Sequence, residues 1–184
     1  MVQLTVAELR ENLEQTGTID AALQLKRAMN RKELSDPKQV TVKGVPVTIV
    51  AGPPGSGKTT YAKKNAGSND LIVDLDDIKA EISKGKPHRT DDQWSVAALK
   101  HRNKILNNLK PDDYDRVWLV VGAPSEARRS EWEHQTNADN TVVMDTSQDQ
   151  CNANIDADSS RVGSKAQHKE WVSQWFERDS YTGE

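Results

Sequence analysis

An eight-residue segment, GPPGSGKT at positions 52–59, constrains this chain more than any other part of its sequence. The spacing G-x-x-x-x-G-K-[ST] is typical of a phosphate-binding loop, whose glycines let backbone N–H groups turn toward phosphate oxygens. In such a loop the lysine reaches the β- and γ-phosphates, and the following hydroxyl is a ligand of Mg²⁺. The segment therefore predicts ATP and Mg²⁺ as ligands, with Thr59 on the metal. The residues expected to bind the nucleotide are Gly52, Pro53, Pro54, Gly55, Ser56, Gly57, Lys58, Thr59 and Thr60.

The flanks of this loop support the prediction. Residues 45–50 form a short run rich in β-branched side chains, which is typical of a buried parallel strand. Residues 59–66 are compatible with a helix that stops at Gly67. Strand, glycine loop and helix, in this order, are the setting that the motif requires. A glycine-rich turn that binds nothing would rarely have both flanks.

Composition excludes several classes of protein. The chain has 184 residues and a net charge of −3, which fits one domain with a core and lacks the strong basicity usual for nucleic-acid binding. A single cysteine, Cys151, excludes an internal disulfide and suits a reducing compartment. No apolar stretch approaches the about 20 residues that span a bilayer. We therefore expect a cytoplasmic protein with no membrane partner.

The chain divides at about residue 43. Residues 1–43 are predicted to form a helical extension, with one short helix capped by Thr5 and a second that Asp20 caps and Asp36-Pro37 ends. Residues 40–42 are expected to pair with the first core strand as a hairpin. A role for this extension in binding a protein partner stays open.

Residues 44–184 are predicted to form the main domain. Strand candidates are 47–50, 71–74, 117–121 and 141–144, and helical patterns separate them, including residues 91–109, 147–157 and 165–176. This alternation predicts an α/β fold with a parallel sheet of four to five strands flanked by helices, as in P-loop NTPases. The aromatic residues of the last helix, among them Trp171 and Trp175, are interpreted as core.

Acidic residues follow the second predicted strand, at the edge where ligands bind in an open α/β sheet. A carboxylate near the γ-phosphate can accept the proton of an attacking hydroxyl. Asp76 is the first candidate for this catalytic base and Asp74 the second. Asp77 is equally suited to cap the helix that follows.

Phosphoryl transfer also requires cations around the transferred group. Arg161 is the first candidate, because it lies in a polar, glycine-containing segment near 158–165 that is typical of a mobile lid. Arg128 and Arg129 follow the third strand and are candidates for contacting the acceptor. Simple surface positions are nearly as plausible for these two arginines.

Other P-loop classes fit less well. The third predicted strand ends in Gly122-Ala123-Pro124 without the aspartate that a motor ATPase would use. No Asn-Lys-x-Asp signature of a GTPase is present. By exclusion, a kinase that acts on a small substrate is the leading class.

Residues 45–178 resemble the polynucleotide kinase type of P-loop kinase, which is common in bacteriophages. An AAA-like phage ATP-binding protein is the alternative resemblance. The resemblance to polynucleotide kinases rests on the loop, the pair Asp76-Asp77, an Arg-Arg-x-x-Trp segment at 128–132, and a lid with Arg161. It implies transfer of the γ-phosphate to a 5′-hydroxyl at a single-stranded nucleic-acid end. Lys79 stands where that family has an arginine and is a candidate for binding the acceptor. The family's Asp-Thr pair after the third strand is replaced by 121–124.

Three functions therefore stay open. The first is a kinase with a polynucleotide acceptor, for which basic residues at 84–89, Lys100, His101, Arg102 and Lys104, with Trp94 nearby, offer a binding surface. The second is a kinase with a small acceptor, similar to zeta-toxin-like enzymes. The third is a nucleotide-switched NTPase or binding module in phage DNA handling, which would need Lys58 but not Asp76.

Overall fold

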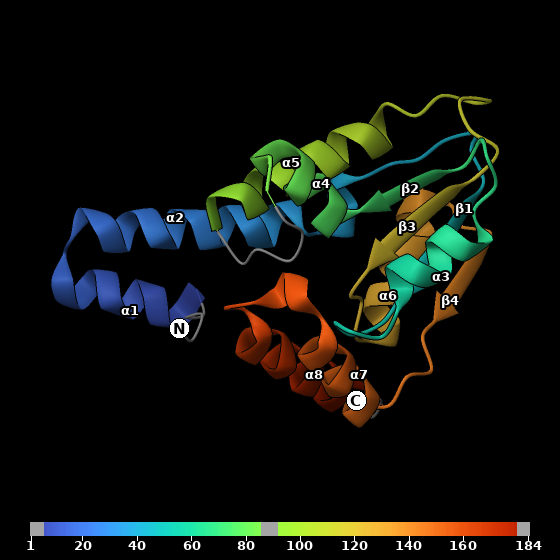
Figure 1. Cartoon of the computed structure of the whole chain (residues 1–184). Coiled ribbons are helices and arrows are strands. Elements are labelled where there is room, and N and C mark those ends of the chain that lie inside the picture. The colour runs from blue at the N-terminus through green and yellow to red at the C-terminus, as the bar shows by residue number, and fades with distance from the viewer. Residues whose placement is uncertain (1–5, 86–91, 180–184) are drawn as a thin grey trace.

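The computed structural model describes residues 6–85 and 92–179, and its centre is a four-stranded sheet (Figure 1). The strands are β1 (Val47–Ala51), β2 (Leu71–Asp74), β3 (Val117–Val121) and β4 (Asn140–Val143), all parallel, in the order β2-β3-β1-β4. This confirms the predicted α/β class with a parallel sheet flanked by helices. No helix within the described ranges is long and apolar enough to cross a membrane.

Alternating side chains of the strands pack on two layers of helices. Val47, Ile49 and Ala51 of β1 face a main core that includes residues of α4 (Leu75–Ser83), α5 (Asp92–Asn107) and α6 (Glu126–Thr136). Val50 faces the other side, where α3 (Lys58–Asn65) contributes Ala62. The sheet therefore lies between helices on both faces, which explains why its strands are apolar runs.

The C-terminal helices build a separate small core. Helices α7 (Gln148–Ala157) and α8 (Lys165–Asp179), joined through the short helix η2 (Ser159–Arg161), form the orange-to-red pair in Figure 1. Their shared buried residues are Cys151, Ile155 and Val172, with Phe176 against them. Trp175 is also buried, and its indole N–H donates to the carbonyl of Gly122 at 3.0 Å. The interpretation of this residue as core is confirmed.

The N-terminal extension forms two antiparallel helices, α1 (Val6–Thr16) and α2 (Ile19–Leu34), followed by the short helix η1 (Pro37–Gln39). The prediction that Asp20 caps α2 is wrong: Thr18 is the cap, and its hydroxyl accepts from the N–H of Ala21. Thr5, the expected cap of α1, lies outside the described residues.

The predicted hairpin at residues 40–42 is also wrong. These residues form no strand, because Val40 and Val42 are buried in the main core and the N–H of Val42 donates to Gln135 at the end of α6. The side chains of Val40 and Val42 thus fill the core beside α6, and their segment does not join the sheet.

Arg102 is buried, which corrects its assignment to a basic surface. Its guanidinium donates to the carbonyl of Leu34 at 3.0 Å and to Asn103 Oδ1, and it stacks 4.9 Å from the ring of Trp132. Burial, with a smaller effect from the Arg128 charge, lowers the pKa of Arg102 to about 10. Arg102 is buried because it lies one helical turn after Ala98, which is fully buried, on the same face of α5. Residues 86–89 of the proposed basic surface lie outside the described part of the chain.

Trp132→Ala is expected to lower the free energy of unfolding by about 3–5 kcal/mol, because it removes a large buried side chain and the surface on which Arg102 stacks. Urea unfolding followed by circular dichroism measures this change. Trp132→Phe retains an aromatic ring and should lose less. A loss below about 1 kcal/mol for Trp132→Ala would contradict the packing described here.

Candidate active site

The glycine loop joins the end of β1 to the start of α3. Gly55 and Gly57 have φ of +75° and +88°, a region that favours glycine. A Cβ on Gly55 would lie 2.5 Å from the carbonyl oxygen of Cys151. No side chain caps α3 at Gly57, and the buried hydroxyl of Ser56 has no hydrogen-bond partner in the described part of the chain. Uncapped N–H groups and an unsatisfied hydroxyl fit an anion at this position.

Lys58 lies at the centre of a group of charges. Its ammonium donates to the carbonyl of Pro53 at 2.7 Å. Burial lowers the pKa of Lys58 to about 8; Asp74 and Asp76 oppose this effect, and the Arg161 guanidinium adds to it. The four side chains thus lie within electrostatic range of one another, although they come from α3, β2, α4 and η2. The structure thus brings together Lys58, Asp74, Asp76 and Arg161.

Asp74 connects the loop to α4. One carboxylate oxygen accepts from the Thr59 hydroxyl at 2.5 Å, and the other accepts from the N–H of Asp76 at 2.9 Å. Burial raises the pKa of Asp74, although the Thr59 hydrogen bond acts in the opposite direction. Asp74, and not Asp77, is therefore the cap of α4. Asp77 is exposed and pairs with Lys63 at 3.0 Å.

Thr59 and Asp74 are the oxygen ligands that the site offers to a metal. Hydroxyl and carboxylate oxygens suit Mg²⁺, which commonly takes the rest of its ligands from water and phosphate. The described residues contain no cluster of three or more His, Cys, Asp or Glu that would hold a metal alone. The donor set thus fits a cation that arrives with a phosphate group.

Asp76 and Lys79 lie on α4. Asp76 is in the first turn and half-buried, and its backbone is fixed by the capping bond to Asp74. Lys79 is one turn further along and only 8% exposed. The base candidate is thus held firmly at the carboxyl edge of β2, next to the loop.

The predicted lid segment includes η2 and the turn before α8. Arg161 is 8% exposed, and its Nε donates to Asp158 at 3.0 Å. Burial would raise the pKa of Asp158, but hydrogen bonds from Ser160 and Arg161 leave it below its usual value. Gly163, with φ of +86°, follows in the turn. Arg161 is therefore held by its own segment while its charge acts on Lys58.

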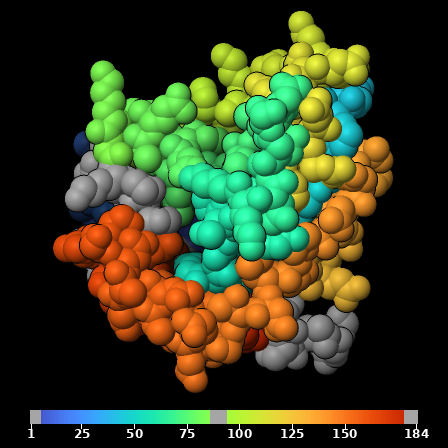
Figure 2. Space-filling view, turned by 45° about the vertical axis from the view of Figure 1, so that its right-hand side comes forward, coloured from blue at the N-terminus to red at the C-terminus, as the bar shows by residue number. Residues whose placement is uncertain are grey.

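Two side chains near α7 contact the loop and have no counterpart among the predicted site residues. Thr146 Oγ1 donates to the carbonyl of Ser56 at 3.0 Å, and Asn154 Nδ2 donates to the carbonyl of Gly55 at 2.8 Å. Figure 2 shows this side, where orange atoms of the chain after β4 lie against the teal atoms around α3. No sequence motif identifies these residues, since Thr146 is an ordinary polar residue after β4 and Asn154 is an ordinary polar residue on α7.

The two arginines after β3 lie in different surroundings. Arg129 donates to the carbonyls of Ala123 and Pro124 at 3.1 and 3.2 Å, directly after β3. Arg128 donates to the carbonyl of Ser35 at 2.7 Å and pairs with Glu131. Arg129 thus shapes the end of β3, while Arg128 contacts the segment after α2.

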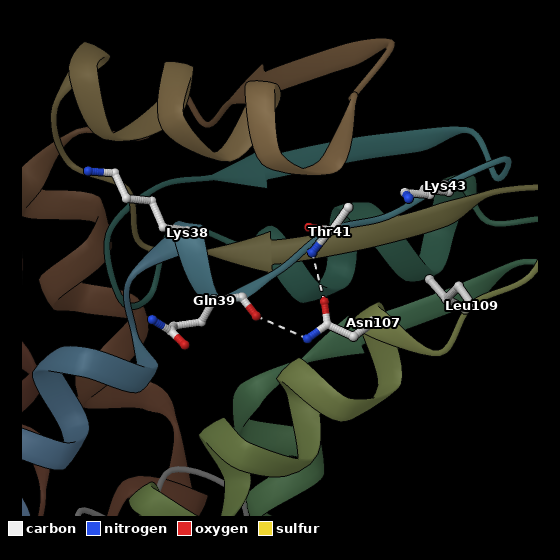
Figure 3. Close-up of a pocket in the computed structure, with 6 residues that line it drawn as sticks. All are labelled: Lys38, Gln39, Thr41, Lys43, Asn107 and Leu109. Carbon is white, nitrogen blue, oxygen red and sulfur yellow. Dashed lines mark hydrogen bonds between the residues drawn. The ribbon is translucent and has the colours of Figure 1, made fainter.

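A groove of about 460 Å³ lies apart from the loop (Figure 3). The Asn107 side chain spans one side of it through hydrogen bonds to the backbone of Thr41 and Gln39. Its lining residues come from the segment before β1 and the end of α5: Lys38, Gln39, Thr41, Lys43, Asn107 and Leu109. None of them belongs to the charge group around Lys58.

Comparison with known proteins adds no relative to this picture. No protein-family model matches the chain, and no curated protein sequence matches it. The chemistry of the site is therefore inferred from its residues: an uncapped glycine loop, two cations, two carboxylates and the hydroxyls of Ser56 and Thr59.

Proposed function

We propose that the chain is an ATP-binding P-loop kinase that transfers the γ-phosphate to a hydroxyl acceptor. The observation that carries this proposal is the meeting of Lys58 and Arg161 with Asp74 and Asp76 beside an uncapped glycine loop. A triphosphate needs the cations and N–H groups, and an attacking hydroxyl needs a carboxylate. The resemblance to polynucleotide kinases in loop, acidic pair and lid arginine supports the same assignment.

In the proposed complex the loop amides and Lys58 bind the phosphates, and the Lys58 ammonium leaves the Pro53 carbonyl to do so. Thr59 and Asp74 would hold Mg²⁺, which neutralises charge on the phosphate oxygens. Arg161, carried by the lid segment, stabilises the charge that develops on the transferred group.

Asp76 acts as the base in this proposal. It accepts the proton of the acceptor hydroxyl while that oxygen bonds to the γ-phosphorus, and the bond from phosphorus to the β-γ bridging oxygen breaks to release ADP. Both oxygens of Asp74 already accept hydrogen bonds from Thr59 and Asp76, which makes Asp74 less suited to this task.

The end of β3 favours a second candidate acceptor. The polynucleotide kinases that this chain resembles have an Asp-Thr pair where this chain has residues 121–124. Within this stretch the carbonyls of Gly122 and Ala123 accept from Trp175 and Arg129. This backbone is engaged within the protein and offers no carboxylate to a nucleic-acid end. A small-molecule acceptor, as in zeta-toxin-like kinases, is therefore the second candidate.

The test is incubation with γ-labelled ATP and Mg²⁺, first with 5′-hydroxyl DNA and RNA oligonucleotides and then with a panel of hydroxyl metabolites. Label on an oligonucleotide supports the polynucleotide acceptor, and label on a metabolite alone supports the second candidate. ATP binding without transfer to either set would reject the kinase in favour of a nucleotide switch.

ATP binding is expected to weaken as the pH rises above about 8. Below this value Lys58 is charged in the free protein and attracts the phosphates; above it, binding must first protonate the amine. The dissociation constant should then rise by up to about tenfold per pH unit. Titration of a fluorescent ATP analogue between about pH 6.5 and 9.5 measures this, and Lys58→Arg, which stays charged, should give a flat profile. A flat wild-type profile would contradict the assignment.

A further inference from the structure

Two polar side chains outside the glycine loop hold its central peptides; together we name Thr146 and Asn154 the loop latch. Thr146 lies between β4 and α7, and Asn154 lies on α7. They donate to consecutive carbonyls, Thr146 to that of Ser56 and Asn154 to that of Gly55. The latch thus fixes two neighbouring peptide planes from one side.

The planarity of the trans peptide gives these contacts a consequence. In each peptide the C=O and the following N–H point in opposite directions. When the carbonyls of Gly55 and Ser56 face the latch, the N–H groups of Ser56 and Gly57 face the loop interior. On that side the Ser56 N–H donates to the Pro53 carbonyl, with 3.3 Å between nitrogen and oxygen, and the same oxygen accepts from the Lys58 ammonium. Inward N–H groups around positive-φ residues form a concave site for anions.

The loop needs such an external restraint. Gly55 and Gly57 permit the left-handed backbone that the loop requires, but glycine also permits many other conformations. A flipped peptide would turn a carbonyl oxygen toward the phosphates and repel them. A loop that binds an anion well must therefore have its peptide orientations fixed before the ligand arrives.

We infer that Thr146 and Asn154 are positioning residues of the phosphate site: Thr146 keeps the Gly57 amide directed at the ligand, and Asn154 holds the neighbouring peptide, whose Ser56 N–H closes the loop onto the Pro53 carbonyl. The inference rests on the proposed function and names residues that the glycine-loop motif does not contain. The plainer explanation, that both side chains only attach α7 to the domain, predicts a change in stability without a change in anion affinity.

The experiment measures the affinity of the full chain for ATP and for inorganic pyrophosphate by calorimetry, together with the thermal midpoint. Thr146→Val keeps the shape and removes the hydroxyl, and Asn154→Ala removes the other donor. Each should weaken both ligands about three- to tenfold, as expected for one lost hydrogen bond that orders a site, while Thr146→Ser should retain wild-type affinity. The NMR chemical shift of the Gly57 amide proton should change less on pyrophosphate binding in Thr146→Val than in the wild type.

Thr141→Val is the matched control, since the Thr141 hydroxyl in β4 is buried and forms no hydrogen bond within the described residues. It should leave affinity unchanged. If the wild type binds ATP and both latch variants bind equally well, the inference is overturned and the proposed function stands. If the wild type binds neither ligand, the proposed function fails and the latch has no anion to serve. Should Thr146→Val not fold, Asn154→Ala decides, because its side chain is exposed.

Discussion

Lys58→Ala is expected to reduce phosphoryl transfer by about 10²–10³-fold, the largest effect of any change in the loop. Lys58 is the cation that the loop itself supplies to the proposed phosphates. Arg161 is bound to Asp158 outside the loop and therefore cannot take the place of Lys58. Steady-state kinetics with labelled ATP, combined with a binding measurement on the same preparation, would show whether affinity, turnover or both are lost.

The same substitution should not destabilise the protein near neutral pH. The pKa of Lys58 lies below its ordinary value because burial disfavours the charge, so the unfolded state holds this proton more tightly. Between about pH 8 and 10.5 the stability of the wild type should therefore rise with pH, and removing the amine should abolish that rise. Lys64→Ala, an exposed position on the same helix, is the control for both measurements. Equal transfer by Lys58→Ala and Lys64→Ala would refute a phosphate site at the loop.

Asp76→Asn is expected to slow transfer by about 10²–10⁴-fold while ATP still binds, because an amide cannot accept the hydroxyl proton. Its backbone N–H can still donate to Asp74, so the start of α4 should keep its geometry. Single-turnover transfer with bound ATP isolates this step from binding.

Asp77→Asn is the matched control, since it makes the same change at the next position, where the carboxylate is exposed and pairs with Lys63. Its transfer rate should stay near that of the wild type. Full function in Asp76→Asn together with loss in Lys58→Ala would favour a nucleotide switch over a kinase.

Much of the fold follows from local sequence patterns. The β-branched runs at 71–74 and 117–121 became β2 and β3 with the predicted bounds. Their order in the sheet, β2-β3-β1-β4, depends on packing between distant segments and has no local signal. Helix caps were less predictable, because Thr18 and Asp20 are both good capping residues and only the backbone geometry selects Thr18.

The candidate site was predictable where a motif or a local pattern marks a residue, and unpredictable where only tertiary packing brings a residue to the loop. Lys58 and Asp74 could be named from the loop and the end of a strand. Thr146 and Asn154 could not, because their contacts depend on how α7 packs against the loop, about 90 residues or more along the chain from its carbonyls. Arg102 was misassigned for the same reason: its charge indicates a surface residue, but its acceptor, the Leu34 carbonyl, is 68 residues distant.

The way α2 ends has a practical consequence for anyone shortening the chain. The carbonyls of Leu34 and Ser35 are acceptors for Arg102, Asn103 and Arg128, which belong to α5 and α6. A fragment starting at residue 44 would leave the buried Arg102 guanidinium without the Leu34 carbonyl and would also remove Val40 and Val42 from the core. Such a fragment should be insoluble or poorly folded, and its inactivity would say nothing about catalysis. The first 43 residues are therefore best kept in every assay of the protein.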